Sequence, residues 1–153
     1  MLNVYKDYIT PEDEKKIVNF IHDNAENYES VSDRHVLQFG IQWKHGEILP
    51  SIRDVPDFIQ RLVPNANQCL VNIYPPNTFI SYHIDDTRLG PNIHVLSCCA
   101  DTKLELTNGN ETVQYSIPRR SMYVLENELR YDYLHRTLPT DTERISLTFR
   151  CIS

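Results

Sequence analysis

Short apolar runs separated by turn residues recur along most of this 153-residue chain and predict a fold built mainly from β-strands. The expected strands are residues 69–74, 79–82, 93–100, 103–107, 111–117, 121–125, 131–134 and 144–152, preceded by a hairpin or pair of short strands over residues 34–43 that bends at Gly40. The Asn108-Gly109 step between two alternating runs is the strongest hairpin signal in the chain.

Two helices are expected before the main group of strands. Thr10 is followed by Pro11 and by acidic residues, which is typical of a helix N-terminus, and an apolar stripe then predicts a helix over residues 11–24. A second helix, with apolar residues on one side, is expected over residues 55–62. The pattern predicts an α+β, mainly β fold: a double-stranded β-helix (jelly roll) with two N-terminal helices packed on one outer face.

Composition narrows the class of protein without identifying a function. The 21 acidic and 15 basic residues give a net charge of −6, which argues against broad attraction to phosphate backbones. No apolar run approaches the roughly 18 residues needed to span a membrane. The four cysteines lack Cys-x-x-Cys spacing and are expected to be buried, reduced thiols in an intracellular protein of the cytoplasm or nucleus. We expect one domain over residues 1–153, with a monomer favoured.

The pair His83 and Asp85 is the first candidate for chemistry. Residues 79–82 predict a strand that leads into the pair. Alternate residues of a strand point to the same face, so the two side chains would project side by side, about 7 Å apart at their bases. An imidazole and a carboxylate can then bind one divalent metal ion, and a distant histidine would complete a two-histidine, one-carboxylate triad. Alone, the His-x-Asp spacing also arises by chance.

The last predicted strand alternates between apolar and polar residues. One face would belong to a core: Ile145, Leu147 and Phe149. The opposite face would carry the polar set: Arg144, Ser146, Thr148 and Arg150. The two arginines lie about 20 Å apart along the backbone, and their side chains can reach inward to bind a small dicarboxylate, because a guanidinium makes paired bonds to a carboxylate. The alternative is two surface arginines on an edge strand.

His135 taken alone, beside aromatic residues, is also compatible with a structural histidine. The order of the motifs is more specific: Asn72-x-Tyr74, His83-x-Asp85, His135 and finally Arg144-x5-Arg150. Together with residues 34–43, 75–76 and 118–121, this order resembles the AlkB-type Fe(II)/2-oxoglutarate dioxygenases over most of the chain. Within that family, the chain is most similar to the AlkB-like domains that are fused to tRNA methyltransferases.

The resemblance implies a cofactor, a co-substrate and a reaction. Three residues would bind Fe(II), namely His83, Asp85 and His135. Arg144 would bind the remote carboxylate of 2-oxoglutarate with help from the Tyr74 hydroxyl, while Arg150 and Asn72 would serve the end nearer the metal. With O2 as the other co-substrate, 2-oxoglutarate would be converted to succinate while a C–H bond is hydroxylated. If that carbon is an N-methyl group, the product collapses to the amine and formaldehyde.

The substrate is less well determined, because the chain departs from the bacterial DNA-repair members at several positions. Thr87 stands where those members have an acidic residue that helps to read the damaged base, and Ser146 replaces an asparagine. Two aromatic residues, Phe39 and Trp43, would either stack on a base or belong to the core, with Arg34 as a further candidate contact to substrate.

The expected function is therefore demethylation of N-alkylated nucleobases in single-stranded RNA or DNA. Two alternatives remain open. The first keeps the same cofactors but hydroxylates a protein side chain or a modified tRNA base. The second is a catalytically silent binding module.

Overall fold

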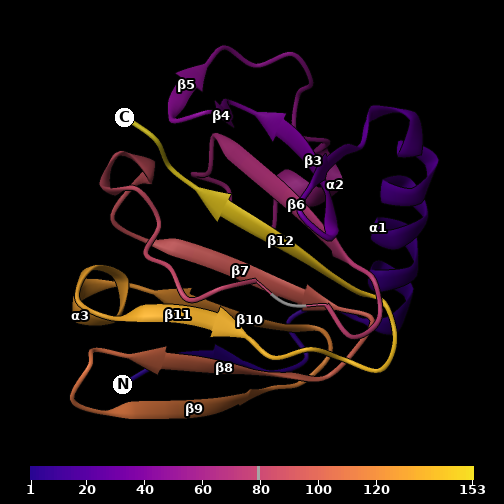
Figure 1. Cartoon of the computed structure of the whole chain (residues 1–153). Coiled ribbons are helices and arrows are strands. Elements are labelled where there is room, and N and C mark those ends of the chain that lie inside the picture. Colours follow the sequence, from indigo (N-terminus) through magenta and orange to yellow (C-terminus); the bar gives the residue numbers. More distant parts are fainter. Residues whose placement is uncertain (79) are drawn as a thin grey trace.

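The computed structural model describes residues 1–78 and 80–153, and the two largest of its antiparallel sheets pack together (Figure 1). In hydrogen-bonded order, the larger sheet consists of β1 (Asn3–Tyr5), β10 (Ser121–Leu125), β7 (Ile93–Cys98), β12 (Arg144–Arg150), β6 (Gln68–Tyr74), β3 (Arg34–Gly40) and β2 (Glu29–Val31). The smaller sheet consists of β11 (Leu134–Thr137), β8 (Thr102–Thr107) and β9 (Thr112–Ile117). The predicted jelly roll is confirmed.

Helix α1 (Pro11–Asp23) covers the outer face of the larger sheet (Figure 1). Its start is the predicted one: the Thr10 hydroxyl accepts from the Asp13 backbone N–H, and the Asp13 carboxylate accepts from the Thr10 N–H, both at 3.1 Å. Ile17 and Ile21 are buried in the same apolar cluster as residues of β3, β6 and β12. Burial of this stripe, more than helix propensity, holds the helix in place.

The second predicted helix is much shorter than expected. Helix α2 spans only Asp57–Gln60, although its Ile59 is buried in the same cluster as α1. The chain turns after Gln60, whose side-chain amide donates to the carbonyls of Val63 (3.2 Å) and Ala66 (2.8 Å). These side-chain bonds satisfy carbonyl groups of the turn, so a further helical turn is not needed there.

Strand β12 is central, because it pairs with β6 on one side and β7 on the other. Its predicted alternation is confirmed: the apolar residues Ile145, Leu147 and Phe149 lie in the core under α1. The polar set faces a cavity between the sheets. The alternative of two surface arginines on an edge strand is wrong, because every residue of β12 is buried.

Two expectations about the strands are corrected. Phe79 lies outside the described residues, and residues 80–82 do not form the predicted strand. Among the described residues of this segment, one isolated bridge, between His83 and His135, extends the smaller sheet. Residue Tyr131 belongs to an unpredicted helix, α3 (Asn127–Tyr131), so β11 begins three residues later than expected. Tertiary contacts of α3 outweigh the strand preference of its aromatic residue.

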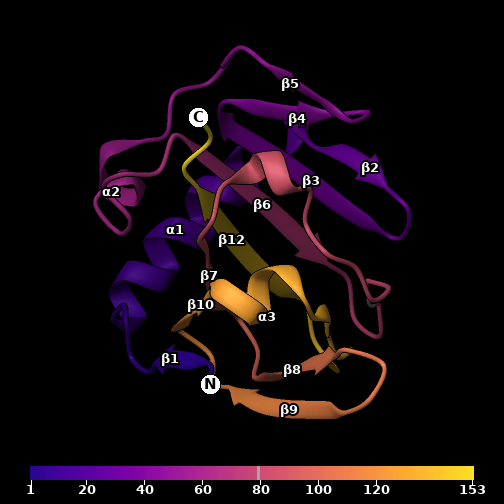
Figure 2. The same ribbon diagram turned by 90° about the vertical axis from the view of Figure 1, so that its left-hand side faces the viewer.

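The segment after β3 turns as predicted at Gly40, where φ is 72° and a side-chain carbon would collide with the Asn67 carbonyl. The chain then forms β4 (Gln42–Lys44), which pairs with β5 (Glu47–Leu49) and not with β3. Figure 2 shows this hairpin at the top of the molecule, beside β2 and β3. The Gln38 side chain of β3 binds this hairpin through two hydrogen bonds. Its oxygen accepts from the Trp43 N–H (2.7 Å), and its amide donates to the Trp43 carbonyl (2.9 Å).

The cysteines are free thiols, but they are not all buried. Cys69 and Cys98 are buried in strands, and Cys99 is partly covered. Cys151 follows the end of β12 and is exposed, which corrects the expectation for that residue. None of the described helices has the length and apolar character needed to cross a membrane.

The turn at Gly40 separates the two aromatic residues, Phe39 and Trp43, that the sequence could not distinguish. Phe39 is 3% exposed, and its ring centroid lies 5.5 Å from that of Phe20 in helix α1. It belongs to the core, which decides between the two alternatives for Phe39 and places it away from substrate. Trp43 lies on the other side of the turn and lines the cavity.

Replacing Phe39 by alanine should lower the free energy of unfolding by about 3–5 kcal/mol, because the cavity left behind cannot close fully. Urea denaturation of the parent and the variant measures the difference. Phe39→Leu is the matched control and should recover most of the loss. A Phe39→Ala variant as stable as the parent would contradict this placement in the core.

Candidate active site

A cavity of about 440 Å³ lies between the two sheets, on the polar face of β12. Its walls come from β6, β7, β10, β11 and β12 and from the loop around residues 80–89. The volume falls within the roughly 300–1,000 Å³ that is typical of small-molecule sites. The cavity is therefore large enough for a co-substrate and part of a substrate.

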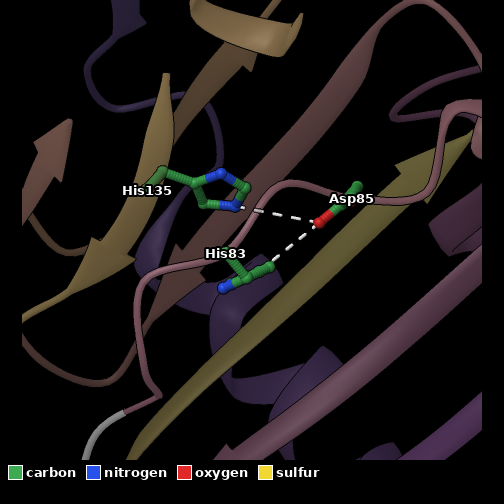
Figure 3. A group of neighbouring side chains, drawn as sticks. All are labelled: His83, Asp85 and His135. Carbon is green, nitrogen blue, oxygen red and sulfur yellow. Dashed lines mark ion pairs between the residues drawn. The ribbon is translucent and has the colours of Figure 1, made fainter. Parts of the chain in front are cut away.

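Three side chains converge at one wall of this cavity, and Figure 3 shows both imidazoles directed at one carboxylate oxygen. Asp85 Oδ1 lies 3.4 Å from His83 Nε2 and 3.8 Å from His135 Nε2. The ligand atoms all lie within 4.8 Å of one another. The proximity was expected, but its cause was not: His83 and Asp85 come from a loop and are not alternate residues of a strand.

Backbone pairing positions the two histidines. His83 N–H donates to the His135 carbonyl (3.1 Å), and His135 N–H donates to the His83 carbonyl (2.8 Å). The neighbouring residues reinforce this bridge, because Tyr82 O–H (3.0 Å) and Arg136 Nε (2.7 Å) both donate to Oε1 of Glu105 on β8. The loop residue Tyr82 is thereby tied to the smaller sheet beside the bridge.

Hydrogen bonding also orients the His83 ring. Its Nδ1 lies 2.9 Å from the Ser81 carbonyl oxygen, which can only accept, so Nδ1 carries the proton. Nε2, directed at Asp85, then keeps its lone pair for a metal ion. A backbone carbonyl that fixes the tautomer in this way is a common arrangement for metal-binding histidines.

The charges favour the protonation states that bind metal ions. Burial alone would raise the pKa of Asp85, but its contact with His83 and the charge of Arg150 hold this pKa well below its usual range. Arg150 Nη2 (2.6 Å) and Nε (3.1 Å) bind Asp85 Oδ2, which leaves Oδ1 for the histidines. Burial, followed by the proximity of His83, lowers the pKa of His135 to about 4. A neutral imidazole and an ionised carboxylate are the forms that coordinate a metal.

The donor set fits a divalent metal ion of the non-haem iron type. Two imidazole nitrogens and one carboxylate oxygen form the triad that binds one face of an octahedral ion and leaves three positions for other ligands. The other carboxylate oxygen of Asp85, Oδ2, already pairs with Arg150, so it does not compete for the metal.

Arg144, elsewhere on the cavity wall, fits the carboxylate of a co-substrate. Its side chain is buried, Nε donates to Ser97 Oγ (2.9 Å), and Nη1 donates to Thr137 Oγ1 (3.2 Å). Nη2 is buried and has no hydrogen-bond partner among the described residues, whose carboxylates all lie beyond ion-pair distance of this guanidinium. A buried cation without a counter-charge is costly, so the site favours an anionic ligand.

Solved structures with the same architecture are known. The structure of OsALKBH1 superposes with a TM-score of 0.79 at 13% identity, covering 97% of each chain. A prolyl-4-hydroxylase of Pseudomonas putida gives a TM-score of 0.68 at 14% identity, covering 99% of this chain and 93% of that one. The chain has the fold of the AlkB-like dioxygenases.

Sequence comparison supports the AlkB-like resemblance more weakly. The Xenopus tropicalis tRNA (carboxymethyluridine(34)-5-O)-methyltransferase alkbh8 is 24% identical, and the match covers 96% of this chain but only 26% of that enzyme. An uncharacterized mimivirus protein, L905, is 25% identical over 97% of this chain and 83% of its own length. No protein-family model matches the chain.

The AlkB-like fold brings most, but not all, of the expected site residues to the cavity. The expected co-substrate residues all line it: Asn72, Tyr74, Arg144 and Arg150. Arg34 also lines it, and its Nε donates to Asn72 Oδ1 at 2.8 Å. Thr87 lies in the short 3₁₀ helix Thr87–Leu89, is exposed and is not part of the lining. Asp86, one residue earlier, lines the cavity instead, because the chain turns at that point.

Several residues of this cavity were not found from the sequence. Tyr123 of β10 lines the cavity, but every residue of that strand is buried, so its alternation carries no signal. Burial raises the pKa of Tyr123, which keeps its hydroxyl protonated. Ser97 and Glu105 were missed because they act through hydrogen bonds to residues distant in sequence.

Replacing His83, Asp85 or His135 by alanine should abolish conversion of 2-oxoglutarate to succinate. The two histidine variants should keep a melting temperature close to that of the parent, whereas Asp85→Ala should lower it, because the buried Arg150 loses its counter-charge. Each variant removes one of three ligands, and all three residues lie outside the apolar clusters. Succinate formation with added Fe(II) and thermal unfolding are the measurements. His22→Ala, which changes an exposed histidine paired with Glu143, is the control. Parent rates in all three variants would refute the metal site.

Arg144→Ala should weaken 2-oxoglutarate binding by about 3–5 kcal/mol, because a buried carboxylate would lose its counter-charge. Arg144→Lys should restore only part of this affinity, since an ammonium cannot make paired bonds to a carboxylate. Calorimetric titration of the metal-loaded protein measures both. If both variants bind 2-oxoglutarate as the parent does, Arg144 is not the carboxylate-binding group.

Proposed function

We propose that residues 1–153 form one AlkB-like domain that acts as an Fe(II)- and 2-oxoglutarate-dependent dioxygenase, and that it demethylates N-alkylated nucleobases in single-stranded RNA or DNA. One observation carries the proposal. A single cavity contains a His-Asp-His triad and the buried, unneutralised guanidinium of Arg144. Arg144 lies on the same polar face of β12 as Arg150, which pairs with Asp85 of the triad. A metal ion and a dicarboxylate together satisfy both.

The residues of the triad and the arginines beside it then have defined roles. Three residues would hold Fe(II): His83, Asp85 and His135. When bound, the iron with 2-oxoglutarate and O2 supplies the oxidation of a C–H bond, with release of succinate and carbon dioxide. Arg144 binds the remote carboxylate, and Tyr74, whose ring lies 5.3 Å from the guanidinium carbon, packs beside it. Arg150 keeps Asp85 ionised and directs its free oxygen at the metal.

Apolar side chains separate this chemistry from water. Leu70 of β6 and Ile93 and Val95 of β7 line the cavity beside the polar face of β12. They leave the ionic groups in a low-dielectric site, where the interaction between a guanidinium and a carboxylate is stronger than in water. The protein therefore supplies ligation, orientation and a dry cavity.

Basic and aromatic side chains at the cavity support a nucleic-acid substrate. Trp43, Arg34 and Arg136 line the cavity, although the chain as a whole carries a net charge of −6. The guanidinium carbon of Arg88 lies 5.0 Å from the centre of the Trp43 ring. Stacking of a base on an aromatic ring, with arginines near phosphates, is the usual way in which proteins bind single strands.

Similarity to a prolyl-4-hydroxylase supports one alternative, hydroxylation of a protein side chain with the same cofactors. Similarity to part of a tRNA methyltransferase supports another, hydroxylation of a modified tRNA base without demethylation. The third alternative, a silent binding module, leaves the buried charge of Arg144 without a role.

Succinate formation with Fe(II) and 2-oxoglutarate separates these functions. Single-stranded RNA and DNA containing 1-methyladenine or 3-methylcytosine should raise the rate and release formaldehyde in equal amount, whereas the unmodified oligonucleotides should not. Stimulation only by protein extract or by bulk tRNA, without formaldehyde, would select the corresponding alternative. No succinate under any condition would leave the silent module.

Trp43→Ala should weaken binding of a methylated single-stranded oligonucleotide by about 1–3 kcal/mol, which is the usual contribution of one base–aromatic stack. Because Trp43 lies on a separate hairpin, 2-oxoglutarate affinity should stay the same and the melting temperature should barely change. Fluorescence anisotropy and thermal unfolding measure these quantities, with Trp43→Phe as the conservative control. Unchanged oligonucleotide binding would move the protein-hydroxylase alternative ahead.

A further inference from the structure

Arg130 of α3 is a fully buried arginine that none of the roles above explains. It is 2% exposed and ranks among the largest fully buried side chains of the described chain. Within that part of the chain, no carboxylate lies at ion-pair distance from its guanidinium. A charge buried in this way needs strong hydrogen-bond partners, and Arg130 has three of them.

All three partners are backbone carbonyls of one short loop. Arg130 Nη1 donates to the Asp85 carbonyl (2.8 Å), Nη2 to the Asp86 carbonyl (2.8 Å) and Nε to the Gly90 carbonyl (3.0 Å). One planar guanidinium thus holds both the beginning and the end of residues 85–90. An arginine suits this task because its donors point in fixed directions from a rigid plane.

The loop that Arg130 holds carries the carboxylate of the candidate metal site. Asp85 belongs to no strand, so no sheet ladder fixes its backbone. Its carboxylate is bound by Arg150, but its main chain is bound by Arg130. Gly90, at the other end, has a φ of 99° and packs against the Cys151 carbonyl, so the loop cannot shift freely there either.

Arg130 also connects two metal-ligand segments that are far apart in the sequence. Helix α3 ends at Tyr131 and leads directly into β11, which carries His135. The guanidinium of the α3 segment therefore binds the backbone of the Asp85 segment, across 45 residues of sequence. The other connection between ligands, the His83–His135 bridge, does not include Asp85.

We propose that Arg130 is a positioning residue, which sets the place of Asp85 relative to His135 and thereby determines the affinity and geometry of the metal site. This inference rests on the proposed function, because it assumes that the three side chains bind a metal ion. Outer residues that orient metal ligands typically change metal affinity by about 10–100-fold when they are replaced. If Arg130 served only the stability of the fold, its replacement would lower stability without changing metal affinity or coordination geometry.

Co²⁺ titration of the metal-free protein tests the proposal, with the visible absorption spectrum as a report on coordination geometry. Arg130→Met removes all three donors, and its Co²⁺ dissociation constant should rise by about 10–100-fold with an altered spectrum. Arg130→Lys keeps the charge, but its single ammonium cannot reach three carbonyls, so its dissociation constant should lie between those of the parent and Arg130→Met.

Two control variants separate the possible outcomes. Ile21→Ala destabilises the distant core under α1 and should bind Co²⁺ as the parent does despite its lower melting temperature. His135→Ala should lose the Co²⁺ signal.

If the parent gives no more signal than His135→Ala, the metal site and the proposed function fail together. If the parent binds Co²⁺ and both Arg130 variants match its affinity and spectrum, only the role of Arg130 is overturned. Failure of both Arg130 variants to fold where Ile21→Ala stays folded would likewise assign Arg130 to fold stability and overturn its positioning role.

Discussion

The pairing of β12 with β6 on one side and β7 on the other is the constraint on which the rest of this structure depends. A strand held on both edges cannot rotate, so its alternation assigns one set of residues to each face. The apolar set completes the core under α1, while Arg144 and Arg150 are directed into the cavity. The same ladder therefore builds the core and the polar floor of the active site.

The buried arginines around that site are neutralised to different extents. Arg150 is paired with Asp85, so this ion pair is complete in the protein alone. Arg144 is satisfied only in part and lacks a counter-charge among the described residues. Arg130 is satisfied by carbonyl groups, which carry no net charge. In a low-dielectric cavity, the positive charge of Arg144, which lacks a counter-charge, attracts an anion to one defined place.

The segments at the cavity entrance are held by side-chain contacts more than by sheet ladders. Gln38 bonds the backbone of Trp43 from the end of β3, and Arg88 connects the same hairpin, through the Gly46 carbonyl (2.9 Å), to Asp86 in the loop after the metal ligand. Loops on a rigid scaffold are where binding residues usually lie.

Local pattern determined several elements of this protein, and long-range pairing decided their geometry. Period-two alternation predicted β12 and both of its faces, the Thr10–Asp13 cap predicted α1, and motif order singled out the triad, because these signals lie within a few residues or in a fixed order along the chain. Phe39 and Trp43 were indistinguishable from sequence, since only the pairing of β3 with β6 and of β4 with β5 places one in the core and the other at the cavity. The loop carrying Asp85 and the bonds of Arg130 were decided by contacts between segments 45 residues apart, which no local pattern encodes.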